Sequence, residues 1–154
     1  MTETQELAMG RFSVEVELSN HKDIIGVELG AVSPDKVRRT KARGVVDSSS
    51  TRLIIPQSLA DQLGLQISGT TKVRYADGRT ADRGIAQDVH LAYGGRESVF
   101  SAVVEPNRKS ILVGAIVLEE LDLIVDCTTG RLVPRDPKHI VSEAEGYDDS
   151  ILNG

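Results

Sequence analysis

The alternation of apolar and polar residues predicts a protein built mainly from short β-strands. Every second residue from Phe12 to Leu18 is apolar, which is the period of a strand with one buried face. A turn over 19–23 and a second strand over 24–29 are expected to follow. A strand rich in basic residues should then run directly into Gly44-Val45-Val46-Asp47.

Two short segments are typical of helices instead. Pro56 can begin a helix and Gly64 can end one, so a helix is predicted over 56–63. Apolar residues four positions apart predict a second helix over 114–121. Both helices are short, so they can only accompany a sheet and cannot form a bundle by themselves.

Turn residues divide the rest of the chain into hairpins. The dipeptide Asp77-Gly78 is a strong signal for a tight hairpin turn. The fold class is therefore mainly β, a small closed or half-closed barrel with two short helices. The first predicted hairpin joins a strand that begins at Val73 to a strand over 80–91. The second turns at Gly94-Gly95 and returns as a strand over 99–104. The last joins 123–126 to 131–133 around Thr128-Thr129-Gly130.

Composition fits one globular domain. The chain has 154 residues, 40% of them hydrophobic, and a formal net charge of -5. We expect the domain to span 11–141, with a flexible N-terminus over 1–10 and a disordered acidic tail over 142–154. The N-terminus lacks the basic and apolar pattern of a signal peptide, and no apolar run is long enough to span a bilayer. We therefore expect a soluble, cytoplasmic protein that does not bind membranes.

Several kinds of chemistry are disfavoured. The single cysteine, Cys127, excludes an intramolecular disulfide and a multi-cysteine metal site. The three histidines are far apart and none has ligand spacing on a predicted helix, so neither a metal nor another cofactor is expected. The acidic balance argues against nucleic-acid binding, and the basic stretch 36–43 is interpreted as a solvated edge strand.

One carboxylate stands out by its position. Asp47 directly follows two β-branched apolar residues and precedes Ser48, Ser49 and Ser50, which favour turns. This pattern, followed by an apolar strand and a short helix, resembles the active-site loop of the retroviral-type (retropepsin-like) aspartic proteases. Leu112-Val113-Gly114 at the start of the second predicted helix is similar to the second half of that signature. The resemblance covers roughly 44 to 134, and Ser49 stands where the family has glycine.

The resemblance implies an activity and an assembly. Asp47 would be the catalytic carboxylate of an aspartic endopeptidase, and a chain with one such motif would form its paired site as a homodimer. Ser48 would bond across the dimer to the partner loop, and the Ser50 hydroxyl would donate to the carboxylate. The hairpin tip Ala76-Asp77-Gly78-Arg79 would be a flap that closes over a peptide or protein substrate.

Other interpretations remain open. Ser49 favours a catalytically silent homodimer that keeps the groove and binds extended peptides by strand addition. A β-barrel interaction domain, in which Asp47 only caps a turn, is a third candidate. The segment around Asp126 echoes the Asp47 stretch. We interpret it as an ordinary terminal hairpin, although a monomeric Asp47 and Asp126 pair is an alternative.

Overall fold

The computed structural model describes residues 11–136 and residue 138. The segments predicted to be a flexible N-terminus (1–10) and an acidic tail (142–154) lie outside these residues. The elements that it describes are β1 (Arg11–Asn20), α2 (His21–Glu28), the 3₁₀-helix η1 (Pro34–Lys36), β2 (Arg39–Asp47), β3 (Ile54–Pro56), α3 (Gln57–Gln62), β4 (Ile67–Arg74), β5 (Thr80–Tyr93), β6 (Arg96–Glu105), β7 (Ile111–Val113), α4 (Ala115–Glu120), β8 (Leu123–Asp126) and β9 (Arg131–Pro134).

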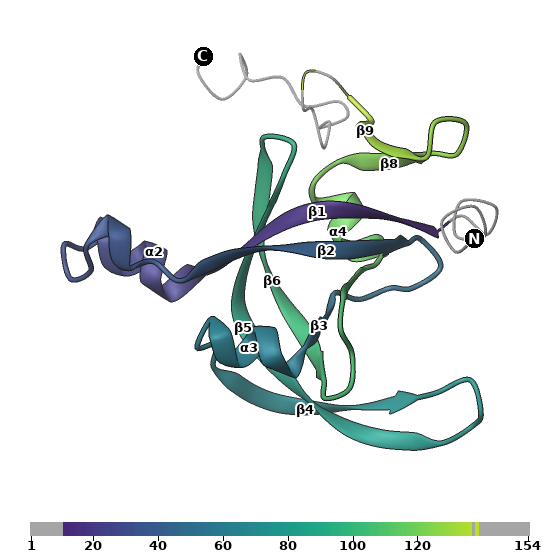
Figure 1. Ribbon diagram of the computed structural model, residues 1–154, viewed down its shortest axis with the longest axis horizontal. Helices are drawn as coiled ribbons and strands as arrows, with labels where there is room; N and C mark the ends of the chain where they lie inside the picture. Colours follow the sequence, from purple (N-terminus) through teal and green to yellow (C-terminus); the bar gives the residue numbers. More distant parts are fainter. Residues whose placement is uncertain (1–10, 137, 139–154) are drawn as a thin grey trace, which may run out of the picture.

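Six strands form a closed barrel. Their order is β1-β2-β7-β3-β6-β5, and a pairing between β1 and β5 closes the ring. Strand β4 pairs with β5 outside that ring and extends from it as a long hairpin (Figure 1). The mainly β class and the closed barrel are as predicted, and both expected helices are present as α3 and α4. Strand β4 begins six residues before the predicted start at Val73.

The alternating residues that predicted the strands fill the barrel. Leu18 of β1, Val46 of β2 and Ile111 of β7 are all fully buried, and Leu91 of β5 lies with them in one core cluster. Burial of each such side chain contributes about 1.5–3 kcal/mol to folding. No helix in the described part of the chain is long and apolar enough to cross a membrane.

The strand predicted over 24–29 is wrong, because this segment is the helix α2. Its apolar residues suggested a buried strand, yet no residue of α2 is buried, and Leu29 just beyond it is 77% exposed. The helix starts because the Asn20 side chain accepts hydrogen bonds from the backbone N–H groups of Lys22 and Asp23. A cap of this kind satisfies donors that the first turn otherwise leaves unpaired.

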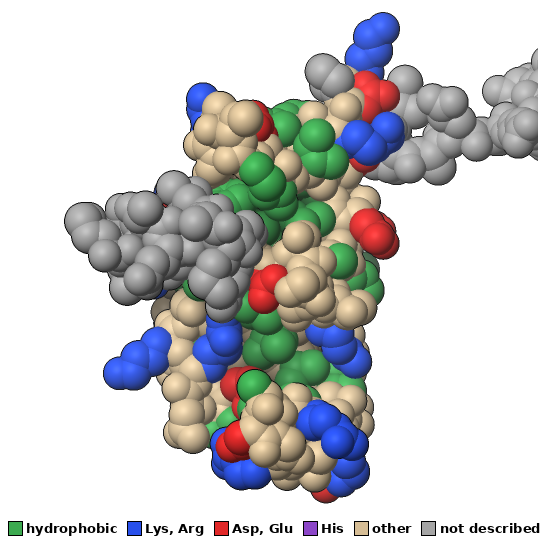
Figure 2. Space-filling model, turned by 90° about the vertical axis from the view of Figure 1, so that its right-hand side faces the viewer, with side chains coloured by type: hydrophobic (Ala, Val, Ile, Leu, Met, Phe, Trp, Pro, Cys, Tyr) green, Lys and Arg blue, Asp and Glu red, His purple; other side chains and the backbone are tan. Residues whose placement is uncertain are grey.

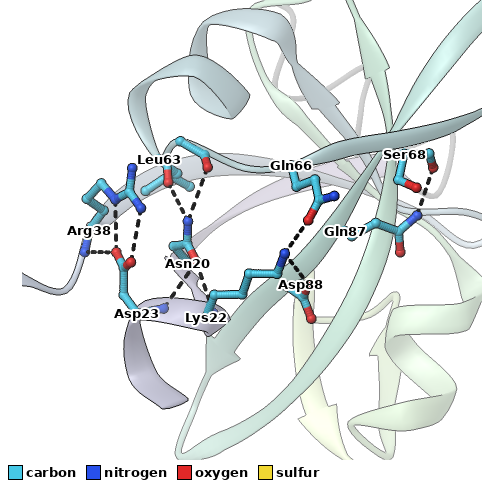
Figure 3. A network of polar contacts seen from close by, with 10 residues as sticks. Asn20, Lys22, Asp23, Arg38, Leu63, Gln66, Ser68, Gln87 and Asp88 are labelled. Carbon is cyan, nitrogen blue, oxygen red and sulfur yellow. Dashed lines mark hydrogen bonds and ion pairs between the residues drawn. The ribbon is translucent and has the colours of Figure 1, made fainter. Parts of the chain in front are cut away.

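Asn20 also connects α2 to the barrel. Its Nδ2 donates to the carbonyl oxygens of Leu63 at 2.9 Å and Gly64 at 3.3 Å, at the end of α3 (Figure 3). Its Oδ1 accepts from the backbone N–H of Lys22 at 2.9 Å. Asp23 receives both the backbone N–H and the guanidinium of Arg38. One 4% exposed amide therefore fixes two helices that are far apart in sequence.

We predict that Asn20→Ala lowers the free energy of unfolding by about 1–3 kcal/mol, since it removes the cap and leaves a buried carbonyl unpaired. Urea denaturation followed by circular dichroism measures the change. Asn107→Ala is the matched control, because Asn107 is exposed. Equal stability of the two variants would show that the amide network does not hold α2.

A buried arginine attaches the terminal hairpin to the barrel. Arg96, at the start of β6, donates through Nη1 to the carbonyl oxygens of Leu121 at 2.9 Å and Asp122 at 2.7 Å. Burial alone would raise the pKa of the Asp122 carboxyl, but the hydrogen bond and charge of Arg135 and the charge of Arg96 hold it below its ordinary value. The β8–β9 sheet is thereby fixed beside α4 without a strand pairing to the barrel.

Candidate active site

Asp47 lies where the chain leaves the barrel between two strands that are not neighbours. Strand β7 pairs in parallel with β2, with Val46 opposite Val113. It pairs in the antiparallel sense with β3, with Leu112 opposite Ile54. The loop from Asp47 to Leu53 must therefore cross over the end of β7. That crossing holds the half-buried Asp47 at the rim of the barrel.

Gly114 allows this crossing, because the loop passes directly over it. A Cβ on Gly114 would lie 2.4 Å from the carbonyl oxygen of Arg52 and 2.7 Å from that of Ser50. The first N–H groups of α4 then donate to the same loop, Ala115 to Ser50 at 2.7 Å and Ile116 to Thr51 at 2.9 Å. These bonds satisfy helix donors that would otherwise be unpaired. The two halves of the predicted motif are thus in direct contact.

We predict that Gly114→Ala lowers the free energy of unfolding by about 3 kcal/mol or more, because the new methyl group meets backbone atoms that cannot rotate away. Thermal or urea denaturation measures the loss. Gly84→Ala is the control, since its Cβ would meet only the Cγ2 of the exposed Ile67 side chain, which can rotate. Similar stability of both variants would mean that the loop does not depend on this close approach.

Ser49 holds the Asp47 carboxylate from within the loop. Its backbone N–H donates to Oδ1 at 3.1 Å, and its hydroxyl donates to the same oxygen at 2.6 Å. The backbone N–H of Ser50 donates to the Asp47 carbonyl oxygen at 3.1 Å and closes the turn. Ser49 is not among the described residues with positive φ, so its backbone does not require glycine. Glycine at this position would provide the same N–H group but not the hydroxyl.

The other predicted loop residues are placed as follows. Ser48 and Ser49 are exposed, and Ser50 is half-buried under the crossing with α4. The hydroxyl that donates to the carboxylate in the described residues is that of Ser49, whereas Ser50 uses its backbone groups. Asp126 lies at the tip of the β8–β9 hairpin, which was expected as an ordinary terminal hairpin. Hydrogen bonds from the side chains of Thr128 and Thr129 lower the pKa of Asp126.

The segment Ala76-Asp77-Gly78-Arg79 is the exposed tip of the hairpin between β4 and β5. Gly78 has φ of 87°, and its N–H donates to the Tyr75 carbonyl oxygen at 2.9 Å. The backbone N–H and the guanidinium of Arg79 both donate to Asp77 and hold the pKa of that carboxyl below its ordinary value. This tip and the loop after β2 lie on the same side of the molecule in Figure 1.

Sequence reasoning missed a polar cluster between this hairpin and the end of β6. The Tyr75 hydroxyl lies 2.8 Å from Glu105 Oε1 and 2.9 Å from Oε2, and it donates to that carboxylate. The Arg83 Nε donates to Glu105 Oε1 at 2.8 Å and to the Tyr75 hydroxyl at 2.9 Å. No local pattern could reveal the cluster, because Glu105 is 22 and 30 residues from its partners. In the part of the chain that the structure describes, no three histidine, cysteine or acidic side chains are grouped to hold a metal.

Comparison with known proteins agrees with this architecture. No protein-family model and no curated protein matches the sequence. Among solved structures, the EIAV protease complexed with the inhibitor HBY-793 is similar with a TM-score of 0.50 and 12% identity, over 72% of this chain and 88% of that one. The solution structure of the simian foamy virus (mac) protease has a TM-score of 0.45 and 14% identity, over 69% of this chain and 90% of that one.

At 12% identity, the similarity to the EIAV protease concerns the fold. The chain therefore has the retropepsin-like fold that its two motifs predicted. The loop after β2, which was predicted from its resemblance to the active-site loop of that family, reads Asp47-Ser48-Ser49-Ser50.

Proposed function

We propose that this protein is an aspartic endopeptidase that acts as a homodimer, with Asp47 as its catalytic carboxylate. The observation that carries the proposal is the position of Asp47. It is half-buried at the rim of a retropepsin-like barrel, on a loop fixed against Gly114, with the Ser49 N–H donating to its carboxylate at 3.1 Å.

The chemistry requires a second carboxylate. Two carboxyl groups within about 3 Å share one proton, because both cannot be ionised at that distance. The ionised group takes a proton from a water molecule, and the acid form protonates the carbonyl oxygen of the peptide bond as the water oxygen attacks its carbon. This gives a tetrahedral intermediate with no covalent bond to the enzyme. Because the chain has one such loop, Asp47 of a second copy supplies the partner group.

The hairpin tip 76–79 acts as the flap in this proposal. It is exposed and lies on the same side as the Asp47 loop (Figure 1). Closing over an extended peptide excludes water from the reaction and offers backbone groups to the substrate. One of the two coupled carboxyls must stay protonated, so activity is expected at acidic or mildly acidic pH.

We predict that Asp47→Asn abolishes peptide cleavage, by about 10³-fold or more, while the dimer persists. The amide keeps the shape of the side chain but cannot share the proton. Cleavage of a mixed peptide library, read by mass spectrometry, measures activity, and sedimentation at micromolar concentration measures the dimer. Asp35→Asn, a change at an exposed aspartate, is the control. Undiminished cleavage by Asp47→Asn, or a strict monomer whose activity is lost in Asp126→Ala, would contradict this assignment.

A second candidate function is a silent homodimer that binds extended peptides without cleaving them. The observation that favours it is the Ser49 hydroxyl, which lies 2.6 Å from Asp47 Oδ1. A hydroxyl held on this oxygen takes up an acceptor position that a proton shared with a second carboxyl would otherwise use. Peptide binding needs only the groove and the flap, so it does not depend on that proton.

We predict that Ser49→Gly raises cleavage about tenfold, which corresponds to about 1.4 kcal/mol in the activation barrier. It keeps the N–H that donates to Asp47 and removes the hydroxyl. Glycine should lower the free energy of unfolding by roughly 0.5–1 kcal/mol through the unfolded chain. Initial rates on the same library across acidic to neutral pH measure the effect.

Ser49→Ala separates the two possible causes of that gain. A higher cleavage rate in both variants assigns the effect to the lost hydroxyl, whereas a higher cleavage rate in the glycine variant alone assigns it to the bulk of the Cβ. Equal, robust activity of all three proteins would show that Ser49 does not limit catalysis. No cleavage by any of them, with peptide binding retained, would select the silent homodimer.

A further inference from the structure

A pocket of about 460 Å³ lies against the β4–β5 hairpin, from its tip residue Arg79 to Arg83. It is formed by the hairpin, by β3 and by the connection that follows β6. Figure 2 looks onto this side of the molecule, where hydrophobic side chains run along the middle of the face and basic and acidic side chains gather at the lower end, by the hairpin. The lining residues that bear on its chemistry are Ile54, Tyr75, Arg79, Arg83, Glu105 and Arg108.

The one acidic group of the lining is already neutralised. Glu105 is 14% exposed and accepts from the Arg83 guanidinium at 2.8 Å. The Tyr75 hydroxyl donates to the same carboxylate and accepts from Arg83. These contacts also fix the Arg83 side chain, which is 25% exposed at the pocket wall. Glu105 therefore orients an arginine and does not make the pocket acidic.

The rest of the charged lining is basic. Arg79 lies over the Tyr75 ring at 5.3 Å and is 74% exposed, with Asp77 outside the lining as its ion-pair partner. Arg108 donates through Nε to the Ser110 carbonyl oxygen at 2.7 Å, which orients its side chain. With the paired carboxylates of Glu105 and Asp77 counted, the three arginines leave a formal excess of one positive charge at the pocket. Planar guanidinium groups held in place are well suited to bind a carboxylate.

The pocket is close to the Asp47 loop. Ile54 of β3, on the pocket wall, pairs with Leu112 of β7, and Leu112 pairs with Val45 of β2. Two strand spacings separate Ile54 from Val45, which is about 10 Å. Asp47 lies two residues beyond Val45, about 7 Å further along β2, which places it about 12 Å from Ile54. An extended peptide advances about 3.3 Å per residue, so this pocket lies about three to four residues from a peptide bond at Asp47.

We propose that this pocket binds an acidic side chain, Asp or Glu, of the extended peptide, within about four residues of the bond at Asp47. The interpretation of this preference as a cleavage specificity rests on the proposed function. The whole chain has a net charge of -5, so the preference comes from these arginines and not from a generally basic surface.

The first test measures binding to the Asp47→Asn protein, which cannot cleave the probe. The probes are fluorescein-labelled eleven-residue peptides of Ala and Val in which one Glu, Gln or Lys is moved along the chain. We expect the Glu peptide to bind about tenfold more tightly than the Gln peptide at one position, with Lys weakest. The preference should decrease as salt is added.

Charge-removing variants locate the effect. Arg79→Gln and Arg108→Gln together should reduce the preference for Glu to threefold or less, whereas Arg131→Gln, an exposed arginine on β9, should leave it unchanged. Equal affinities for Glu and Gln at every position, or a preference that survives the double variant, overturns the proposal. Absence of binding by any peptide overturns it as well.

The second test separates this inference from the proposed protease. The wild-type protein is incubated with a mixed peptide library, and the cleavage sites are aligned. Enrichment of Asp or Glu at one position near the cut supports the pocket. Cleavage without such enrichment overturns the pocket and leaves the protease. Glu-dependent binding without any cleavage supports the pocket on a silent peptide-binding protein and overturns the protease.

Discussion

The close approach of Gly114 to the Asp47 loop is the contact on which the candidate site depends. Strand β7 lies between β2 and β3, which the loop joins, so the loop has to pass over the end of β7. With carbonyl oxygens 2.4 and 2.7 Å from the place where a Cβ would be, only glycine fits there. The position of the carboxylate is therefore set by the barrel topology and by the absence of a side chain at Gly114, and not by the loop sequence alone.

Ser49 changes the electrostatics of this loop more than its shape. Its N–H donates to Asp47, as an amide at that position should, and its backbone needs no positive φ. The added hydroxyl donates to the same oxygen at 2.6 Å. Asp126 and Thr128 repeat this arrangement in the β8–β9 turn. An aspartate followed two residues later by a hydroxyl residue thus forms the same local turn twice, so the turn by itself does not define a catalytic group.

The sequence predicted what depends on local period and missed what depends on distant partners. Strand alternation is local, and the barrel followed from it. Each half of the motif could be recognised locally, but the contact of the Asp47 loop with Gly114 was not predicted, because more than 60 residues separate the two halves. The helix α2 was missed although its cap is local, because its apolar residues were interpreted as a strand. The anchoring of that cap was missed because the carbonyls that hold the Asn20 amide are 43 and 44 residues away. The Tyr75 and Glu105 contact was missed for the same reason, since 30 residues separate its partners.

A basic pocket on an acidic protein limits what kind of selectivity is physically possible. At physiological ionic strength charges act over about 8 Å, so the net charge of -5 does not cancel the field of arginines inside a pocket. It does oppose the approach of a strongly acidic chain from a distance. The two effects together favour a peptide that is nearly neutral overall and carries one acidic side chain at the pocket. In the complex proposed above, contact of that side chain with the arginines would select the register of the peptide, and the register would decide which bond lies at Asp47.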